Sequence, residues 1–157
     1  MKTNHFFAPR HGPVWVALAL GLSICGVAQA QFAQVPQTAT KTAPRSSQAE
    51  IEKEYRIDAA RHLYAAYPKR IYKGKLPPLL FSVMIVETDI DATGQVGAVR
   101  VVRPPAAPEV EPWVLAMIKG AAPFPAPARM RGVRYLDIWL VDKSGQFQVD
   151  TLTEGQR

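Results

Sequence analysis

The chain has 157 residues, a net charge of +6 and a single cysteine, Cys25. This length suits one domain, and one cysteine excludes an internal disulfide framework. The mild excess of basic residues favours solubility or weak attraction to anionic surfaces over nucleic-acid binding.

Residues 1–30 are typical of a secretory signal peptide. A basic start precedes the apolar, uncharged stretch 14–28, and Ala28-Gln29-Ala30 is a small-residue cleavage pattern. We expect cleavage after Ala30, which predicts export and removes Cys25. The alternative is an uncleaved anchor in the inner membrane, although the apolar stretch is shorter than the roughly 20 residues of a bilayer span.

The next segment, 31–48, lacks periodicity and is rich in Ala, Thr, Gln, Ser and Pro, which predicts a disordered linker. Ser47-Gln48-Ala49-Glu50 has the form of a capping box, so we expect a helix to start there and the folded domain to cover 49–153. The helix should end by Tyr67, because Pro68 disfavours helical geometry in the residue before it. One apolar face of this helix is predicted from a four-residue spacing: Ile51, Tyr55, Ala59 and Leu63.

Two apolar runs, 80–86 and 96–102, are joined through the turn quartet Asp91-Ala92-Thr93-Gly94 and predict an antiparallel hairpin. The first run is apolar at nearly every position, which predicts a central strand that is covered on both faces or flanked on both sides. The acids near the turn begin like a calcium loop, but Arg100 stands where that loop needs a glutamate. We therefore expect no metal site, and interpret the acids as turn formers and edge charges.

A second helix is predicted from Trp113 to about Ala121, with Pro112 in its first turn. A strand over 133–141 follows, and its residues alternate between two faces. A short last strand, 147–151, and a loose tail, 154–157, complete the chain. The order of elements predicts an α+β fold, with a small three- to four-stranded antiparallel sheet packed by two helices. The two faces of the strand 133–141 carry Leu136, Ile138 and Leu140 on one side and Tyr135, Asp137 and Trp139 on the other.

Catalytic chemistry finds little support in the sequence. His62 is the only histidine left after the expected cleavage, and no motif places a base beside a serine nucleophile. Glu87 and Asp89 would share a solvated face at a strand end, where their pKa values would not readily diverge as a carboxylate pair requires. We expect no enzyme activity, no catalytic or metal-binding residue, no cofactor and no small-molecule substrate.

Several motifs together resemble the C-terminal domain of TonB-type energy transducers, the TonB/TolA type of periplasmic domain. They are Tyr67-Pro68, the Asp-x-x-Gly-x-Val stretch 91–96, Val99-x-Val101, and the Ala-Ala-Pro-Phe-Pro stretch 121–125, followed by an aromatic-aliphatic strand. The resemblance covers about 67–151. It implies a periplasmic location and a link to outer-membrane transport.

In such domains a peptide segment of a transporter adds as a strand to one edge of the sheet, through main-chain hydrogen bonds. The resemblance implies that an envelope protein or an outer-membrane receptor segment pairs with the strand 133–141, and no nucleic-acid partner is expected. Two alternatives stay open: a membrane-anchored energy transducer with an uncleaved N-terminal helix, and a homodimer formed through the same edge. The candidate partner-binding residues are Arg134, Tyr135, Leu136, Asp137, Ile138, Trp139, Leu140 and Val141.

Overall fold

The structure is a computed structural model, and it describes Phe32, Ala39 and residues 46–157. The predicted signal peptide and most of the predicted linker lie outside the described residues. Among the described residues, no helix combines the length and the hydropathy that crossing a membrane requires.

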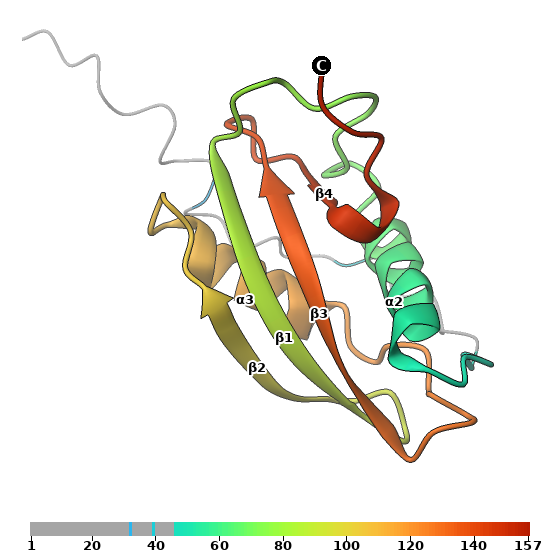
Figure 1. Ribbon diagram of the computed structural model, residues 1–157. Coiled ribbons are helices and arrows are strands. Elements are labelled where there is room, and N and C mark those ends of the chain that lie inside the picture. The colour runs from blue at the N-terminus through green and yellow to red at the C-terminus, as the bar shows by residue number, and fades with distance from the viewer. Residues whose placement is uncertain (1–31, 33–38, 40–45) are drawn as a thin grey trace, which may run out of the picture.

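The described residues form a four-stranded antiparallel sheet in the order β2-β1-β3-β4, with two α-helices on one side of it (Figure 1). The predicted α+β class is therefore confirmed. The buried core lies between this face of the sheet and the helices, whereas the other face is left to solvent, as antiparallel sheets allow. The elements in chain order are α2 (Glu52–Ala66), β1 (Ser82–Asp91), β2 (Val96–Arg103), α3 (Val110–Gly120), β3 (Gly132–Val141), β4 (Phe147–Val149) and a short 3-10 helix (Asp150–Leu152).

β1 is the central strand, and it pairs with β2 on one side and with β3 on the other. Its residues alternate between buried and half-exposed, beginning with buried Ser82 and ending with exposed Asp91. The prediction of a flanked strand is confirmed, and the option of a strand covered on both faces is wrong. The half-exposed positions include Val83 and Ile85, so apolar side chains also occupy the solvent face.

β3 alternates as predicted, and the structure decides which of its faces is buried. Tyr135, Asp137 and Trp139 face the helices and are buried, whereas Leu136 is exposed on the other face. The aromatic side chains fill the space under the helices: Tyr135 contacts Tyr55 of α2, with ring centroids 5.7 Å apart. The aliphatic face of β3 is therefore the one that faces solvent.

α2 begins at Glu52, so the predicted start at the capping box is wrong. Ser47 is instead in extended backbone that bridges Pro127: its N–H donates to the carbonyl of Ala126, and its carbonyl accepts from the N–H of Ala128. This tertiary pairing draws Ser47 out of the helix. Ile51, predicted on the apolar face, is 54% exposed, while the other predicted positions of that face are buried.

The second helix starts three residues earlier than predicted, at Val110, and ends at Gly120. Its apolar stripe, formed by Val114, Met117, Ile118 and the capping residue Ala121, is buried. The loop after it packs on the hairpin turn, where the N–H of Phe124 donates to the carbonyl of Gly94. Gly94 has a φ of +86°, and a Cβ there would lie 2.1 Å from the carbonyl oxygen of Phe124, so both the turn and the packing require glycine.

Both ends of the described chain pack onto the domain. The tail, predicted to be loose, pairs with the segment before β1: the N–H of Arg157 donates to the carbonyl of Leu76. At the other end, Phe32 of the predicted linker is buried against Phe81 and Trp113. Phe32 and Ala39, the two described residues of this stretch, thus both pack against the core. Burial of Phe32 stabilises the fold by about 1.5–3 kcal/mol, and a favourable ring pair adds about 0.5–1.5 kcal/mol.

Candidate functional site

The predicted partner-binding strand is β3, and one part of its outer edge is already paired. β4 pairs with β3 at Trp139, Leu140 and Val141. The far edge of β4 is closed in turn, because Phe147 bridges Ile71 through two backbone hydrogen bonds. The last three predicted site residues are therefore occupied by the protein's own strand.

The next peptide group along the edge is capped by a side chain. The N–H of Ile138 donates to Oδ1 of Asp150, at 3.0 Å, in the 3-10 helix that ends β4. Arg56 of α2 holds this carboxylate in place by donating from Nη2 to both of its oxygens, each at 3.0 Å. Asp150 thus accepts the hydrogen bond that a backbone carbonyl would accept if β4 were longer.

Beyond this cap the edge of β3 is open. In an antiparallel strand the N–H and C=O of one residue point to the same side, and successive residues alternate. Since the N–H of Ile138 points away from β1, the peptide groups of Leu136 and Arg134 do so as well, whereas Tyr135 and Asp137 bond toward β1. Among residues 46–157, no strand pairs with this stretch of β3. The open edge therefore runs from Gly132 to Asp137, and of the predicted site residues only Arg134, Tyr135, Leu136 and Asp137 lie on it.

Asp137, at the end of the open edge, has a buried side chain that faces the helices. Asp137 is 3% exposed; its Oδ1 accepts from the hydroxyl of Thr151 at 3.2 Å, and its Oδ2 has no hydrogen-bond partner. Burial raises the pKa of Asp137 to about 7. The guanidinium of Arg56 opposes this, but at 3.6 Å from Asp137 it is closer to Asp150 and offsets only part of the desolvation.

The solvent face beside the open edge carries an ion network. Arg134 donates from Nε to Asp89 at 2.6 Å, and Arg100 of β2 donates to Asp89 at 2.9 Å and to Glu87 at 3.0 Å. These hydrogen bonds hold the pKa of Asp89 below its ordinary value. The predicted edge charges are therefore paired across three strands.

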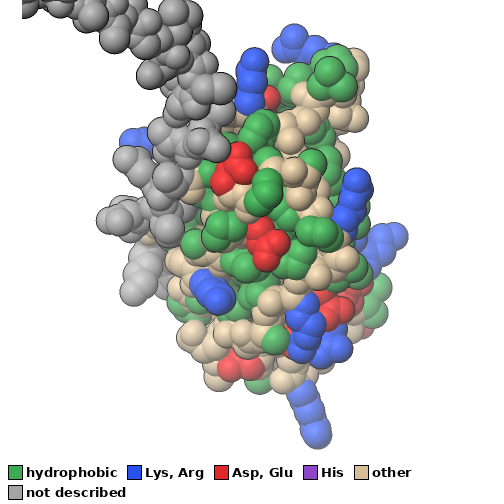
Figure 2. Space-filling model, turned by 90° about the vertical axis from the view of Figure 1, so that its left-hand side faces the viewer, with side chains coloured by type: hydrophobic (Ala, Val, Ile, Leu, Met, Phe, Trp, Pro, Cys, Tyr) green, Lys and Arg blue, Asp and Glu red, His purple; other side chains and the backbone are tan. Residues whose placement is uncertain are grey.

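The sequence argument missed a second open edge, on β2. Glu87 faces Arg100 in the ladder, so by the same alternation the peptide groups of Val99 and Val101 point away from β1. No strand among residues 46–157 pairs with them. The visible surface on this side mixes hydrophobic side chains with scattered acidic and basic ones (Figure 2). The signal was available, since a hairpin strand that ends a sheet leaves one side unpaired.

The other residues that were considered for catalysis or metal binding have structural roles. His62 makes a 2.7 Å hydrogen-bond contact with the carbonyl of Ala121, which ties α2 to the end of α3. Asp91 accepts hydrogen bonds from Thr93 and Gln95 and so forms the hairpin turn, as predicted. Within the described residues, no cluster of three or more His, Cys, Asp or Glu side chains could hold a metal ion.

Searches against protein-family models, curated proteins and solved structures found no match to this chain. The open edge itself is thus the main ground for a functional proposal.

Proposed function

We propose that the protein is a periplasmic binding module that takes an extended peptide segment of an envelope protein, for example an outer-membrane receptor, as an added strand on β3. The observation that carries this proposal is the open edge between Gly132 and Asp137, where two residues direct four backbone polar groups to solvent. The resemblance to TonB-type C-terminal domains supports the same edge.

The residues around the open edge indicate which peptide segment would bind there. An added strand opposite Leu136 and Arg134 could form four main-chain hydrogen bonds and would end at the carboxylate of Asp150. The open stretch matches a partner segment of about six residues. Leu136 is 41% exposed, so an apolar residue of the partner would be favoured beside it.

A proline substitution tests the edge because it removes one outward N–H. Leu136→Pro takes away a donor that faces solvent, a position where edge strands tolerate proline, while Leu136→Thr keeps the donor as a matched control. Peptides selected from a displayed random library on the purified protein should bind the parent and the Thr variant, and should bind the Pro variant at least tenfold more weakly.

Hydrogen exchange then locates the contact. A bound peptide should slow exchange at the amides of Arg134 and Leu136. Val99→Pro is the comparison on the other open edge, and should leave binding unchanged. Equal binding to the parent and Leu136→Pro, or a loss of binding in Val99→Pro alone, would refute the proposed site.

A further inference from the structure

A short apolar loop protrudes at the end of the sheet opposite the hairpin turn, where the segment before β1 lies near the C-terminal tail (Figure 1). On one side of the loop Leu76 is buried: its N–H donates to the carbonyl of Gly155 at 2.8 Å, and its carbonyl accepts from the N–H of Arg157 at 3.0 Å. On the other side Ser82 begins β1 and is paired with β3. We call residues 77–80, with the sequence Pro-Pro-Leu-Leu, the apolar loop.

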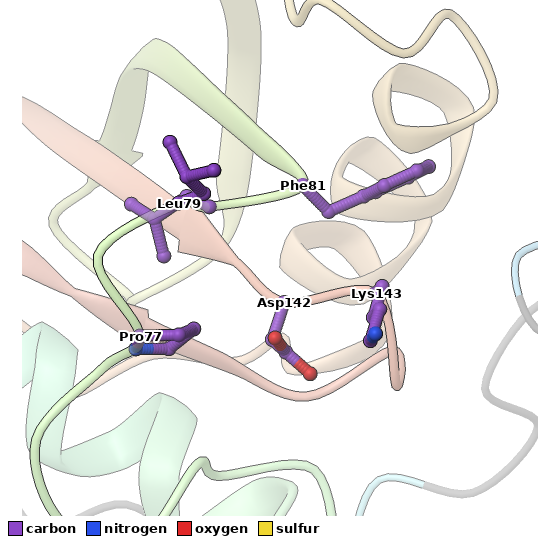
Figure 3. A pocket seen from close by; sticks show the side chains of 6 residues that line it. Pro77, Leu79, Phe81, Asp142 and Lys143 are labelled. Atoms are coloured by element: carbon purple, nitrogen blue, oxygen red, sulfur yellow. The ribbon is translucent and has the colours of Figure 1, made fainter.

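The apolar loop presents a leucine that the fold leaves almost uncovered. Leu79 is 89% exposed, whereas the other large hydrophobic side chains that are exposed in the described residues reach 41–57%. Pro78 beside it is exposed, and Leu80 is half-buried. A pocket of about 300 Å³ adjoins the loop (Figure 3), and its walls are formed by Pro77, Leu79, Leu80, Phe81, Asp142 and Lys143. Single exposed apolar residues are ordinary, but several adjacent ones beside a hollow are typical of an interaction surface.

The exposure of Leu79 is imposed by a loop that is held in place. Pro77 and Pro78 each fix a φ angle, and Nε2 of Gln156 donates to the carbonyl of Pro77 at 3.3 Å. In Figure 3 the side chain of Phe81 extends away from Leu79, toward α3. A loop that is arranged in advance loses little conformational entropy when a partner buries its apolar residues.

Basic side chains surround the apolar loop. Two of them precede it, one lies on the pocket wall in the turn between β3 and β4, and one follows the residue that bonds to Leu76: Lys73, Lys75, Lys143 and Arg157. All four are exposed, and within the segments 70–82 and 141–157 Glu154 is the exposed acid. Figure 2 shows basic and hydrophobic side chains together at this upper end of the molecule. The apolar loop therefore lies in a region of positive charge.

We propose that the apolar loop and the four cations around it form a docking surface for an anionic phospholipid bilayer. Leu79 and Leu80 enter the border between headgroups and acyl chains, while the cations lie against the headgroup phosphates. A bilayer offers an apolar layer directly beneath a negatively charged one, and so it matches both features of the surface. An acidic peptide would match the charges alone. With so few inserted residues the binding is peripheral and reversible.

This surface is separate from the open edge of β3. Ser82 pairs with Val141 and Asp91 with Gly132, so the apolar loop and the start of the open edge lie at opposite ends of β3. The separation is roughly 30 Å at the usual rise of a strand. A domain that is docked through the apolar loop therefore keeps its open edge away from the bilayer and accessible to a partner.

Sedimentation with lipid vesicles tests the surface on the protein as purified from cells. The protein should bind vesicles of phosphatidylcholine and phosphatidylglycerol in about a 2:1 ratio at least tenfold more tightly than vesicles of phosphatidylcholine alone. Leu79→Ser should weaken this binding by about tenfold, and Lys73→Gln combined with Lys75→Gln by about 10- to 30-fold. Ile51→Ser combined with Lys53→Gln is the matched control, because it removes an exposed apolar residue and a charge at the opposite end of the molecule, and should leave binding unchanged.

An environment-sensitive dye shows which part of the chain meets the lipid. Attached through Leu79→Cys, with Cys25→Ser removing the natural thiol, its emission should shift to the blue when anionic vesicles are added. The same dye attached through Ile51→Cys should not respond. Three results would overturn the proposal: equal binding to the two kinds of vesicle, unchanged binding in Leu79→Ser, or equal dye shifts at the two positions. Unchanged binding in Leu79→Ser with a loss in the lysine variant would mean that the surface binds anions in general.

Discussion

Replacing Asp137 by asparagine should make the stability of the protein less dependent on pH. The carboxyl of Asp137 is buried beneath the open edge of β3, and one of its oxygens has no partner. Folding therefore favours the protonated form, and burial raises its pKa from 3.8 to about 7. Asparagine has nearly the same shape and can still accept from Thr151, but it carries no charge to desolvate.

The sign and size of the effect follow from proton linkage. Because the folded pKa is raised, Asp137 contributes stability at low pH, and this contribution is lost as the pH rises from about 4 to about 7. Each pH unit between the unfolded and the folded pKa corresponds to about 1.36 kcal/mol. Through this group the parent should therefore lose about 2–3 kcal/mol of unfolding free energy between about pH 5 and pH 8. The asparagine variant should not show this loss.

Urea unfolding of the parent and Asp137→Asn from about pH 3 to pH 8 measures this difference, with the slope of the transition checked for constancy. Asp89→Asn is the control, because the pKa of Asp89 is lowered by its hydrogen bonds to Arg134 and Arg100. That variant should lose stability relative to the parent, and this loss should shrink as the pH falls below 4. Parallel stability curves for the parent and Asp137→Asn across this range would refute the reasoning, since they would mean that Asp137 titrates normally.

Two further substitutions test the hairpin turn and the edge cap. Gly94→Ala should lower the unfolding free energy by about 2–4 kcal/mol in urea unfolding, because the added Cβ meets the carbonyl of Phe124 and the φ is positive. Gly74 has a φ of +80° but no atom near an added Cβ, so Gly74→Ala should lower it by only about 1–2 kcal/mol. Equal losses in the two variants would contradict the packing argument. Asp150→Ala should cost about 2 kcal/mol and speed hydrogen exchange at the amide of Ile138; an unchanged exchange rate there would mean that Asp150 does not cap the edge.

Local patterns were sufficient where local chemistry decides the structure. The quartet Asp91-Ala92-Thr93-Gly94 has the carboxylate and the glycine that a tight turn needs, so the hairpin could be predicted. The alternation along β3 could be read directly as well. Pro112 and the apolar stripe after it were enough to place the second helix, although its first turn begins earlier.

Contacts between residues far apart in the sequence determine the features that the sequence did not predict. Ser47 has the features of a helix cap, but it bonds to a segment some 80 positions later, and no local pattern signals that choice. Both faces of β3 are largely apolar, so only the packing of the helices selects Tyr135 and Trp139 for the core. The role of Asp150 as a cap likewise depends on Arg56, which reaches it from α2.

Under the proposed function, the open edge of β3 would bind a partner and not a second copy of itself, and the residues beside it supply a reason why it can. An exposed edge is prone to pair with another edge, and charged side chains on the strand oppose this. Arg134 lies in the middle of the open stretch, so antiparallel pairing of two such edges would bring two arginines close together. Asp89 neutralises Arg134 only on the solvent face of the same molecule. A heterologous segment with an apolar or acidic residue at that position meets no such repulsion, so the edge favours a different partner over a second copy.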